Sequence, residues 1–388
     1  MINNNIFEHR KLGRKGPFQL KTAVILGTRP EIIKMSPIIK ELGKQGIDYF
    51  ILHTGQHYSF NMDRIFFKQL QIPEAKYNLE VGSGTHAEQT AKILTRTEQV
   101  LFSEKPDIVL IEGDTNTVLA GALAASKLHL KIGHVEAGLR SYDRQMPEEI
   151  NRIFADHCSD FLFAPTEKAK NNLLREGILK NKIAVTGNSI VDAIYQNIDL
   201  VKHSGDILKV LNIHSKEYFL VTIHRQENVD DRERFLSILR GLELLIAKFQ
   251  FPIVFPIHPR SRKMIQEYKI SINNLTLIDP VDFFAFLQLE KNAKLVLTDS
   301  GGVQEESCIL KTPCVTLRDN TERPETVEVG ANILAGAVAS NILSCSEIML
   351  NLDNTWNNPF GDGKTGERIV TIIHDALVTL KAENIDGE

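Results

Sequence analysis

The sequence predicts an α/β fold of two doubly wound, Rossmann-like domains. From Lys21 onward, short apolar runs rich in β-branched residues alternate with longer amphipathic stretches, which is the pattern of βα units around parallel sheets. The chain has 388 residues, enough for two or three domains of ordinary size. We expect the two domains to face one another across a cleft, because open parallel sheets bind ligands at the carboxyl ends of their strands.

The expected strands form two series, separated by a polar stretch at about residues 202–215. Those of the first series are Thr22–Leu26, Tyr49–His53, Ile108–Ile111, Ile132–Glu136, Phe161–Ala164 and Ile183–Thr186. Those of the second are Phe219–Ile223, Ile253–Ile257, Leu275–Ile278, Leu295–Thr298 and Pro313–Leu317. Apolar periodicity predicts helices between them, among them Pro30–Leu42, His86–Leu101 and a last helix at Gly366–Ala382.

These two series set the expected domain boundaries. Residues 1–20 are basic but lack the apolar segment of a signal peptide, so we expect a loose, solvated extension. Residues 21–195 form the first domain and residues 196–365 the second. The helix in residues 366–388 can pack on either domain, including a return to the first.

Composition argues against several classes of protein. Lys and Arg number 45, Asp and Glu 49, and the net charge is −4, so no bulk charge attracts nucleic acid or an anionic membrane. No apolar run approaches the length of about 18 residues needed to span a bilayer. The four cysteines form no CxxC pair and are too few for a disulfide framework, which favours a cytoplasmic protein.

Two glycine-containing turns suit a phosphate group. After the first expected strand, Gly27 permits a tight turn, while Arg29 and Lys34 add two cations at the start of a helix, an arrangement that suits a diphosphate. The turn is not GxGxxG, so no dinucleotide cofactor is predicted. The alternative is an ordinary turn with a solvated arginine.

The second turn is Asp299-Ser300-Gly301-Gly302, which follows a strand and opens a helix. The glycines let a ligand approach the backbone, and both Ser300 and the helix dipole favour an anion. Glu306, one turn into the helix, can accept hydrogen bonds from ribose hydroxyls. The alternative is a helix with an ordinary N-cap.

Three carboxylates are candidates for proton transfer. Asp114 and Glu136 follow neighbouring strands, so they can share a site and raise one another's pKa. Asp114 can instead cap the next helix. Glu148 stands at a helix start after a long polar loop, where it either complements the dipole or enters the cleft. His224 follows the first strand of the second domain and can pair with phosphate or transfer a proton.

Other polar and aromatic residues carry weaker signals. No HExxH or CxxC spacing is present, so we expect no metal. Phe283 and Phe284 fit the core positions of a helix, and Phe286 can stack on a base.

Taken in order along the chain, these motifs resemble the non-hydrolysing UDP-N-acetylglucosamine 2-epimerases over about Lys21–Ala382. The motifs are Gly27-Thr28-Arg29-Pro30-Glu31, Gly113-Asp114-Thr115, His134-Val135-Glu136-Ala137-Gly138-Leu139-Arg140, Pro147-Glu148-Glu149-Ile150-Asn151-Arg152, Thr186-Gly187-Asn188, Asp299-Ser300-Gly301-Gly302-Val303-Gln304-Glu305-Glu306 and Arg318-Asp319-Asn320-Thr321-Glu322-Arg323-Pro324-Glu325. The resemblance implies a GT-B-like arrangement and the interconversion of UDP-GlcNAc and UDP-ManNAc without nicotinamide or metal. It also implies elimination of UDP to give a 2-acetamidoglucal, re-addition of UDP, a homodimer and a role in polysaccharide biosynthesis.

The resemblance also assigns roles to single residues. It places Asp114, Glu136, Glu148 and His224 among the catalytic groups, with Asp114, Glu136 and His224 also touching the substrate. The other implied substrate contacts are Arg29 and Lys34 at the diphosphate, Ser300, Gly301 and Gly302 at phosphate, Glu306 at the ribose, Phe286 at the uracil and Arg323 at the substrate. Val281 stands where many members carry Gln, so a backbone contact to uracil replaces the side-chain amide.

Two rival activities fit the same architecture, because fold does not fix function. A glycosyltransferase would bind the same UDP-sugar but form no UDP-ManNAc without an acceptor. A hydrolysing 2-epimerase would release free ManNAc and UDP. A third alternative, a UDP-sugar sensor, would bind without exchanging the C2 hydrogen.

Overall fold

The computed structural model describes residues 20–56, 60–201, 205–272 and 274–385. The expected extension at residues 1–20 therefore lies outside the described residues except for Leu20, which is buried. The strands are β1 Lys21–Leu26, β2 Asp48–His53, β3 Tyr77–Asn78, β4 Ile108–Glu112, β5 Lys131–Val135, β6 Phe161–Ala164, β7 Ile183–Val185, β8 Phe219–Thr222, β9 Ile253–Pro256, β10 Leu275–Ile278, β11 Leu295–Thr298, β12 Cys314–Thr316 and β13 Asn332–Leu334.

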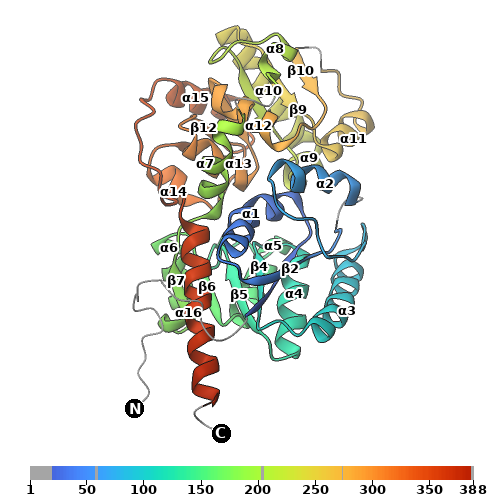
Figure 1. The fold of residues 1–388 in the computed structure, drawn as a ribbon. Coiled ribbons are helices and arrows are strands. Elements are labelled where there is room, and N and C mark those ends of the chain that lie inside the picture. Colours follow the sequence, from blue (N-terminus) through green and yellow to red (C-terminus); the bar gives the residue numbers. More distant parts are fainter. Residues whose placement is uncertain (1–19, 57–59, 202–204, 273, 386–388) are drawn as a thin grey trace. The chain divides into compact units, whose positions relative to one another are not determined.

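Helices fill the connections between these strands (Figure 1). They are α1 Arg29–Lys44, α2 Phe60–Gln69, α3 His86–Glu104, α4 Asn116–Lys127, α5 Pro147–Cys158, α6 Glu167–Arg175, the 3₁₀ turn η1 Lys180–Lys182, α7 Ser189–Val201, α8 Ile207–Leu211, α9 Gln226–Val229, α10 Arg232–Phe249, α11 Pro259–Glu267, α12 Phe283–Asn292, α13 Gly301–Ile309, α14 Pro324–Glu328, α15 Ala339–Leu350 and α16 Thr365–Ile385.

The strands form two parallel sheets with the same kind of order. The first sheet runs β3-β2-β1-β4-β5-β6-β7, and the second runs β10-β9-β8-β11-β12-β13. In each sheet, the first strand along the chain is central. The next two strands add to one side of it, and the remaining strands add to the other side. Because parallel crossovers are right-handed, this reversal sends helices to both faces of the sheet. The predicted α/β class with two doubly wound sheets is confirmed.

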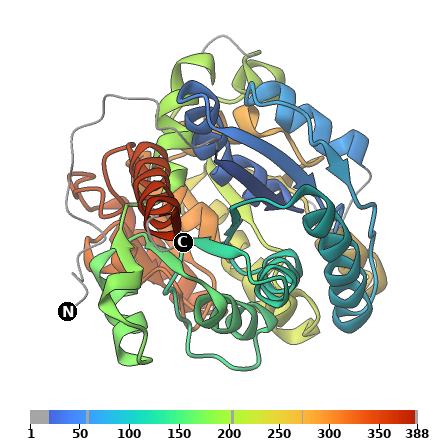
Figure 2. The same cartoon turned by 60° about the horizontal axis from the view of Figure 1, so that its bottom comes forward.

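The central strands are apolar because both of their faces are covered by helices. Every residue of β4 and of β11 is buried. In the first sheet, α3, α4 and α5 pack side by side, while α1 contacts α2 and α16. Figure 2 shows helices of this unit around its strands, with the red α16 among the blue and green elements.

The contacts divide the chain into two units, residues 1–193 with 360–388 and residues 194–359. These divisions differ by a few residues from the expected boundaries after residues 195 and 365. Helix α16 belongs to the first unit. It packs on α1, and the N–H of Gly366 donates to Asp192 at 2.9 Å.

Two strands were missed in the sequence. β3 is only Tyr77–Asn78 and β13 only Asn332–Leu334, and both lie at sheet edges, where few residues need an apolar face. Five expected strands, now β5, β7, β8, β9 and β12, end one residue early. Among them, β5 stops at Val135. Glu136 therefore lies just beyond the strand instead of ending it.

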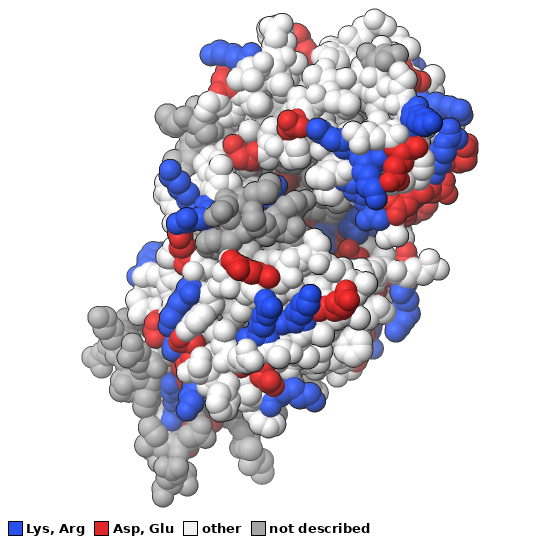
Figure 3. Space-filling model, turned by 90° about the vertical axis from the view of Figure 1, so that its right-hand side faces the viewer, with Lys and Arg blue, Asp and Glu red and all other residues white. Residues whose placement is uncertain are grey.

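Charged side chains of both signs lie on the surface of the molecule. Figure 3 shows one face, on which Lys and Arg are interspersed with Asp and Glu. Among the described residues, no helix is both long and apolar enough to cross a membrane. All four cysteines are free.

Candidate functional site

In each sheet the order reverses between two adjacent strands, β1 and β4 in the first and β8 and β11 in the second. Connections leaving such a pair turn to opposite faces, which opens a crevice at the carboxyl ends of the strands. Most of the sequence-predicted polar residues follow these four strands or the next strand outward. The two units are described in turn.

In the first unit, Lys34 of α1 forms an ion pair with Glu136 just after β5. Its Nζ also lies 3.6 Å from Oε1 of Glu112, the last residue of β4. All three side chains are almost fully excluded from solvent. Burial raises the pKa of Glu112 well above its ordinary value; Lys34 opposes this, whereas Glu136 and Glu31 add to it. The carboxyl group that neighbours Glu136 is thus Glu112, whereas the predicted neighbour, Asp114, pairs with Arg152.

Glu31 is a second buried carboxyl group of α1. It accepts hydrogen bonds from the N–H groups of Gly27 and Thr28 and from the hydroxyl of Thr115. Burial nevertheless raises its pKa to about 7. The first-unit crevice therefore holds more acidic groups than cations to balance them.

The backbone of Glu136 adopts a left-handed conformation with φ of +69°. Few non-glycine residues do so, and such conformations concentrate at functional sites. Gly138 follows with φ of +85°, and a Cβ there would stand 2.3 Å from the carbonyl oxygen of Ala169. The chain therefore turns away from β5 directly after Glu136, the residue that pairs with Lys34.

Asp114 is held by α5 and does not cap α4. Thr115 is the N-cap, since its hydroxyl accepts from the N–H of Thr117. Asp114 instead pairs with Arg152, while Asn151 donates to its carbonyl oxygen at 2.9 Å. The Asp114 carboxylate remains about one quarter exposed. A carboxylate oriented by a buried arginine and still open to solvent is suited to contact a substrate.

Two further predicted residues, Glu148 and Arg29, lie at the first turns of α5 and α1. Glu148 is half-buried in the first turn of α5, the helix that also supplies Arg152. Arg29 begins α1, and its guanidinium lies 5.2 Å from the ring centre of Phe66. Stacking on an aromatic face keeps a cation oriented without neutralising its charge.

A buried network beneath these groups was not predicted. His134 Nδ1 lies 2.7 Å from Asp156, and its Nε2 lies 2.9 Å from the carbonyl oxygen of Gly113. Arg140 contacts the other oxygen of Asp156 at 2.7 Å. Burial favours the neutral acid, but His134 and Arg140 together lower the pKa of Asp156. The network ties the loop carrying Asp114 to β5 and α5.

In the second unit, Asp299 at the end of β11 organises the loop after β8. Its carboxylate accepts from the N–H groups of His224 and Arg225 at 2.9–3.1 Å and from Asn228 at 3.1 Å. The Nδ1 of His224 is 3.0 Å away. Burial acts to raise the pKa of Asp299, but His224 and these donors lower it. His224, one third exposed, is thus oriented by a fully buried acid.

The predicted phosphate turn lies at the start of α13. Ser300 is its N-cap, although its hydroxyl makes no capping hydrogen bond. A Cβ at Gly301 would stand 2.5 Å from a carboxylate oxygen of Glu322, so a side chain there would have to displace this carboxylate from its contact with Arg318. At Gly302 the nearest atom would be 3.9 Å away, which leaves space for a ligand. Glu306 is half-buried on the same helix.

Arginine side chains surround this turn. Arg323 pairs with the buried Glu305 of α13 at 2.5 Å. Arg318 is fully buried and pairs with Glu322 at 2.8 Å and with Glu227 at 3.1 Å. Arg225 approaches Glu322 at 3.3 Å. The second-unit crevice therefore contains cations in close ion pairs.

The predicted base-contacting residues lie on the rim of a core cluster. Val281 and Phe286 are partly buried and pack against it, whereas Phe283 and Phe284 are buried as expected. No group of three or more His, Cys, Asp or Glu suited to a metal ion occurs among the described residues.

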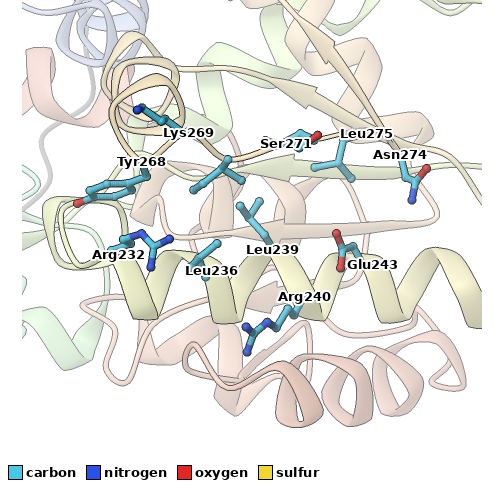
Figure 4. Close-up of a pocket in the computed structure, with 12 residues that line it drawn as sticks. Arg232, Leu236, Leu239, Arg240, Glu243, Tyr268, Lys269, Ser271, Asn274 and Leu275 are labelled. Atoms are coloured by element: carbon cyan, nitrogen blue, oxygen red, sulfur yellow. The ribbon is translucent and has the colours of Figure 1, made fainter.

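A separate hollow of about 310 Å³ lies elsewhere in the second unit, between α10 and residues 268–272, 274 and 275 (Figure 4). Leu236 and Leu239 line it, with Arg232 and Arg240 from the same helix. Leu275, another lining residue, is the first residue of β10. The hollow is therefore not at the carboxyl ends of the strands, where ligands of such sheets bind.

Several residues of these networks were missed as site residues, and two had a detectable signal. Glu112 ends a buried apolar strand and Asp299 follows another. The cost of burying an unpaired carboxylate, applied to Glu136, applies equally to them. Arg152, Asp156 and Arg318 carried no comparable signal, because the partners Asp114, His134 and Glu227 lie 38, 22 and 91 residues away from them.

The family model described as UDP-N-acetylglucosamine 2-epimerase matches residues 40–374 of the chain. A UDP-N-acetylglucosamine 2-epimerase of Methanocaldococcus jannaschii is 58% identical over 361 residues, which cover 91% of this chain and 99% of the relative. A UDP-2,3-diacetamido-2,3-dideoxy-D-glucuronate 2-epimerase of Pseudomonas aeruginosa is 41% identical over 355 residues, covering 90% and 98%.

Solved structures agree with the sequence comparisons. The crystal structure of the M. jannaschii UDP-GlcNAc 2-epimerase in complex with UDP-GlcNAc and UDP matches with a TM-score of 0.87 and 58% identity, covering 92% of this chain and 99% of that one. A glycosyltransferase of Rickettsia africae matches with a TM-score of 0.51 and 14% identity, covering 94% and 97%. That likeness reflects the fold alone.

Proposed function

The chain belongs to the UDP-N-acetylglucosamine 2-epimerase family, and we propose that it is an isomerase that reversibly converts UDP-GlcNAc to UDP-ManNAc. The observation that carries the proposal is the pairing of Lys34 with Glu136 beside Glu112, one strand away from the arginine-held Asp114. Carboxyl groups at adjacent strand ends suit removal of a proton from carbon and its return.

In the proposed reaction, UDP is eliminated across C1 and C2 to give a 2-acetamidoglucal. Re-addition of UDP after protonation of the opposite face then completes the epimerisation. In the first unit, Asp114, Glu136 and Glu148 are the proposed acids and bases. Lys34 holds Glu136 and lies beside the diphosphate, and Arg29 offsets the charge of the leaving UDP.

In the second unit, we assign binding of the nucleotide. Ser300, Gly301 and Gly302 at the start of α13 offer backbone N–H groups to phosphate, and the open space at Gly302 supports this role. Glu306 accepts from the ribose, Val281 and Phe286 contact the uracil, and Arg323 contacts the substrate. His224, oriented by Asp299, pairs with phosphate or transfers a proton.

The sugar is proposed to be N-acetylglucosamine without further substituents. The 58% identical relative bears that substrate in its name, whereas the 41% identical relative is named for a sugar altered at C3 and C6. Turnover of both UDP-sugars, measured side by side, separates the two. A higher kcat/KM for the diacetamido uronate would contradict this choice.

The decisive experiment is proton NMR of UDP-GlcNAc with the enzyme in D2O and no acceptor. We expect UDP-ManNAc to form with deuterium at C2. Free ManNAc and UDP would indicate a hydrolase, and intact UDP-GlcNAc would indicate a transferase. Binding without exchange at C2 would indicate a sensor.

We further propose that the enzyme acts as a cytoplasmic homodimer. Phe102 of α3 and Phe154 of α5 support a second copy as partner, since 69% and 53% of their surfaces are exposed on helices that pack against the same α4. Light scattering coupled to size exclusion measures the mass directly, and a monomer at micromolar concentration would contradict the proposal.

A further inference from the structure

The carboxyl group of Glu112 has no role in the reaction outlined above, although it lies at the centre of the first-unit crevice. It is the last residue of β4 and is 2% exposed. In the sheet it is paired with Val135, so Glu136 lies one residue beyond its neighbour. This register brings the two glutamates to the same edge of adjacent strands.

The surroundings of Glu112 contain more acid than base. From α1 it faces Lys34 and Glu31, and from the loop after β5 it faces Glu136. His53 of β2 acts on Glu31. If Glu31, Glu112 and Glu136 were all ionised, a single ammonium would face three buried negative charges, which low-dielectric surroundings make costly.

The distances and hydrogen bonds indicate which of the three glutamates is protonated. Lys34 is in direct contact with Glu136 but stands 3.6 Å from Glu112, so the ammonium stabilises the negative charge on Glu136 more strongly. Glu31 is stabilised by three hydrogen-bond donors of its own. Glu112 is left as the group for which ionisation is least favourable.

We propose that Glu112 is protonated at neutral pH and acts as a positioning residue, donating its O–H to the Glu136 carboxylate that Lys34 holds from the other side. The positioning role, unlike the protonation, rests on the proposed function. Glu136 is fixed between a cation and a neutral donor, so its remaining lone pairs point toward the substrate. No proton leaves Glu112 during turnover.

The raised pKa of Glu112 agrees with this assignment. A carboxyl–carboxylate pair that shares one proton is stable where two carboxylates at contact distance are not. A neutral donor lowers the basicity of the Glu136 carboxylate, whereas a neighbouring carboxylate would raise it. Glu136 can thus remain ionised and ready to accept a proton.

Infrared spectroscopy on the whole enzyme tests the protonation directly. Glutamate labelled with carbon-13 identifies the C=O band of protonated glutamic acid. The spectrum should be recorded about one pH unit above 7, where Glu31, with a pKa of about 7, is mostly ionised. We expect Glu112→Gln to remove such a band. A spectrum unchanged by this substitution would show that Glu112 is ionised and overturn the proposal.

Kinetics test the positioning role. Glu112→Gln keeps a neutral N–H donor, so kcat should fall by less than about tenfold, whereas Glu112→Leu removes the donor and should lower kcat by about 10²-fold. KM should change by less than about threefold in both variants. Equal kcat values for the two variants would overturn the positioning role.

Glu290→Gln in the second unit is the matched control. Glu290 is also a fully buried acid whose pKa burial raises well above its ordinary value. The substitution should remove a different infrared band; because Glu290 also interacts with Glu306, the variant is a control for the spectrum and not for the kinetics. If the wild-type enzyme makes no UDP-ManNAc, the proposed function fails, while the infrared result still decides the protonation of Glu112.

Discussion

The crevices of the two sheets share a topology and differ in their electrostatics. At the first, three buried glutamates face one lysine. At the second, Glu322 and Glu305 are matched by Arg225, Arg318 and Arg323, and Asp299 is matched by backbone donors. Burial consequently raises the pKa of Glu31 and Glu112, whereas the pKa of Asp299 is lowered.

This difference teaches that burial alone does not set the charge of a carboxyl group. Glu112 and Asp299 are both nearly inaccessible, but Asp299 has N–H donors on both oxygens. Donors that point at a carboxylate replace the water it has lost. We therefore associate the first crevice with proton transfer and the second with binding of an anionic nucleotide.

The largest expected effect separates these two roles. Glu136→Gln keeps the shape of the side chain but removes the base, so turnover should fall by about 10² to 10⁴. UDP affinity should change by less than about tenfold, because the proposed nucleotide contacts are second-unit residues together with Arg29 and Lys34, and not Glu136. Turnover and deuterium incorporation at C2 measure the first effect, and titration calorimetry with UDP measures the second.

Glu148→Gln provides a comparison within the same unit, and Glu306→Gln provides one in the second. We expect Glu148→Gln to behave like Glu136→Gln, and Glu306→Gln to weaken UDP binding. If the first-unit variants lose UDP affinity in parallel with turnover, these glutamates bind the ligand, and the separation of roles between the units is wrong.

The second largest effect concerns stability of the arginine-rich crevice. Arg318→Met removes one partner of a buried ion pair and leaves Glu322, 3% exposed, with a weaker neighbour. The free energy of unfolding of the second unit should fall by about 3 to 5 kcal/mol. Urea unfolding followed by circular dichroism measures the change.

Arg262→Met is the control for this substitution. Its ion pair with Asp279 lies on the surface of the same unit, so its loss should cost less than about 1 kcal/mol. A similar loss in the free energy of unfolding for Arg318→Met and Arg262→Met would show that the buried ion pairs of Arg318 stabilise the unit no more than a surface ion pair does.

The two crevices should also respond to pH with opposite sign. The folded state holds a proton on Glu31 up to a pKa of about 7, against an ordinary value of 4.5, so its contribution to stability declines as pH rises through this range. The decline amounts to about 3 kcal/mol. Glu31→Gln should abolish it in urea midpoints measured across pH 4.5 to 7.

Asp299→Asn tests the opposite case. Because folding lowers the pKa of Asp299, its contribution is present above the unfolded value of 3.8 and is lost as pH falls through the lower folded value. The variant should lose stability at neutral pH and show less of this acid-induced loss. If the free energy of unfolding of Glu31→Gln and of Asp299→Asn varied with pH in the same way, the predicted contrast between the two crevices would be wrong.

The smallest effect is expected at the edge of the first crevice. Arg29 is half-buried and stacked on Phe66, so Arg29→Ala should weaken UDP binding by about tenfold. The loss should shrink as salt rises, because the charge is partly screened. Calorimetric titrations with UDP at low and high salt measure the loss of affinity and its dependence on salt. An unchanged affinity would exclude Arg29 from the site.

The sequence by itself determined the elements and their class. Alternation of apolar runs and amphipathic stretches located β6 and β11 to the residue, because strands buried on both faces carry continuous apolar sequence. Local turn chemistry located the loops after β1 and β11. The order of the strands was not encoded locally, so the two switch points were not predicted.

Only the tertiary structure decided the partners of the charged groups. Lys34 and Glu136 are 102 residues apart, and Asp114 and Arg152 are 38 apart, so no local pattern relates them. Asp114 looked equally suited to capping α4, yet Thr115 took that position and left the carboxylate to Arg152. The protonation of Glu112 depends on the same long-range packing, because the pKa of a buried acid is set by the number of charges and donors that the fold brings to it.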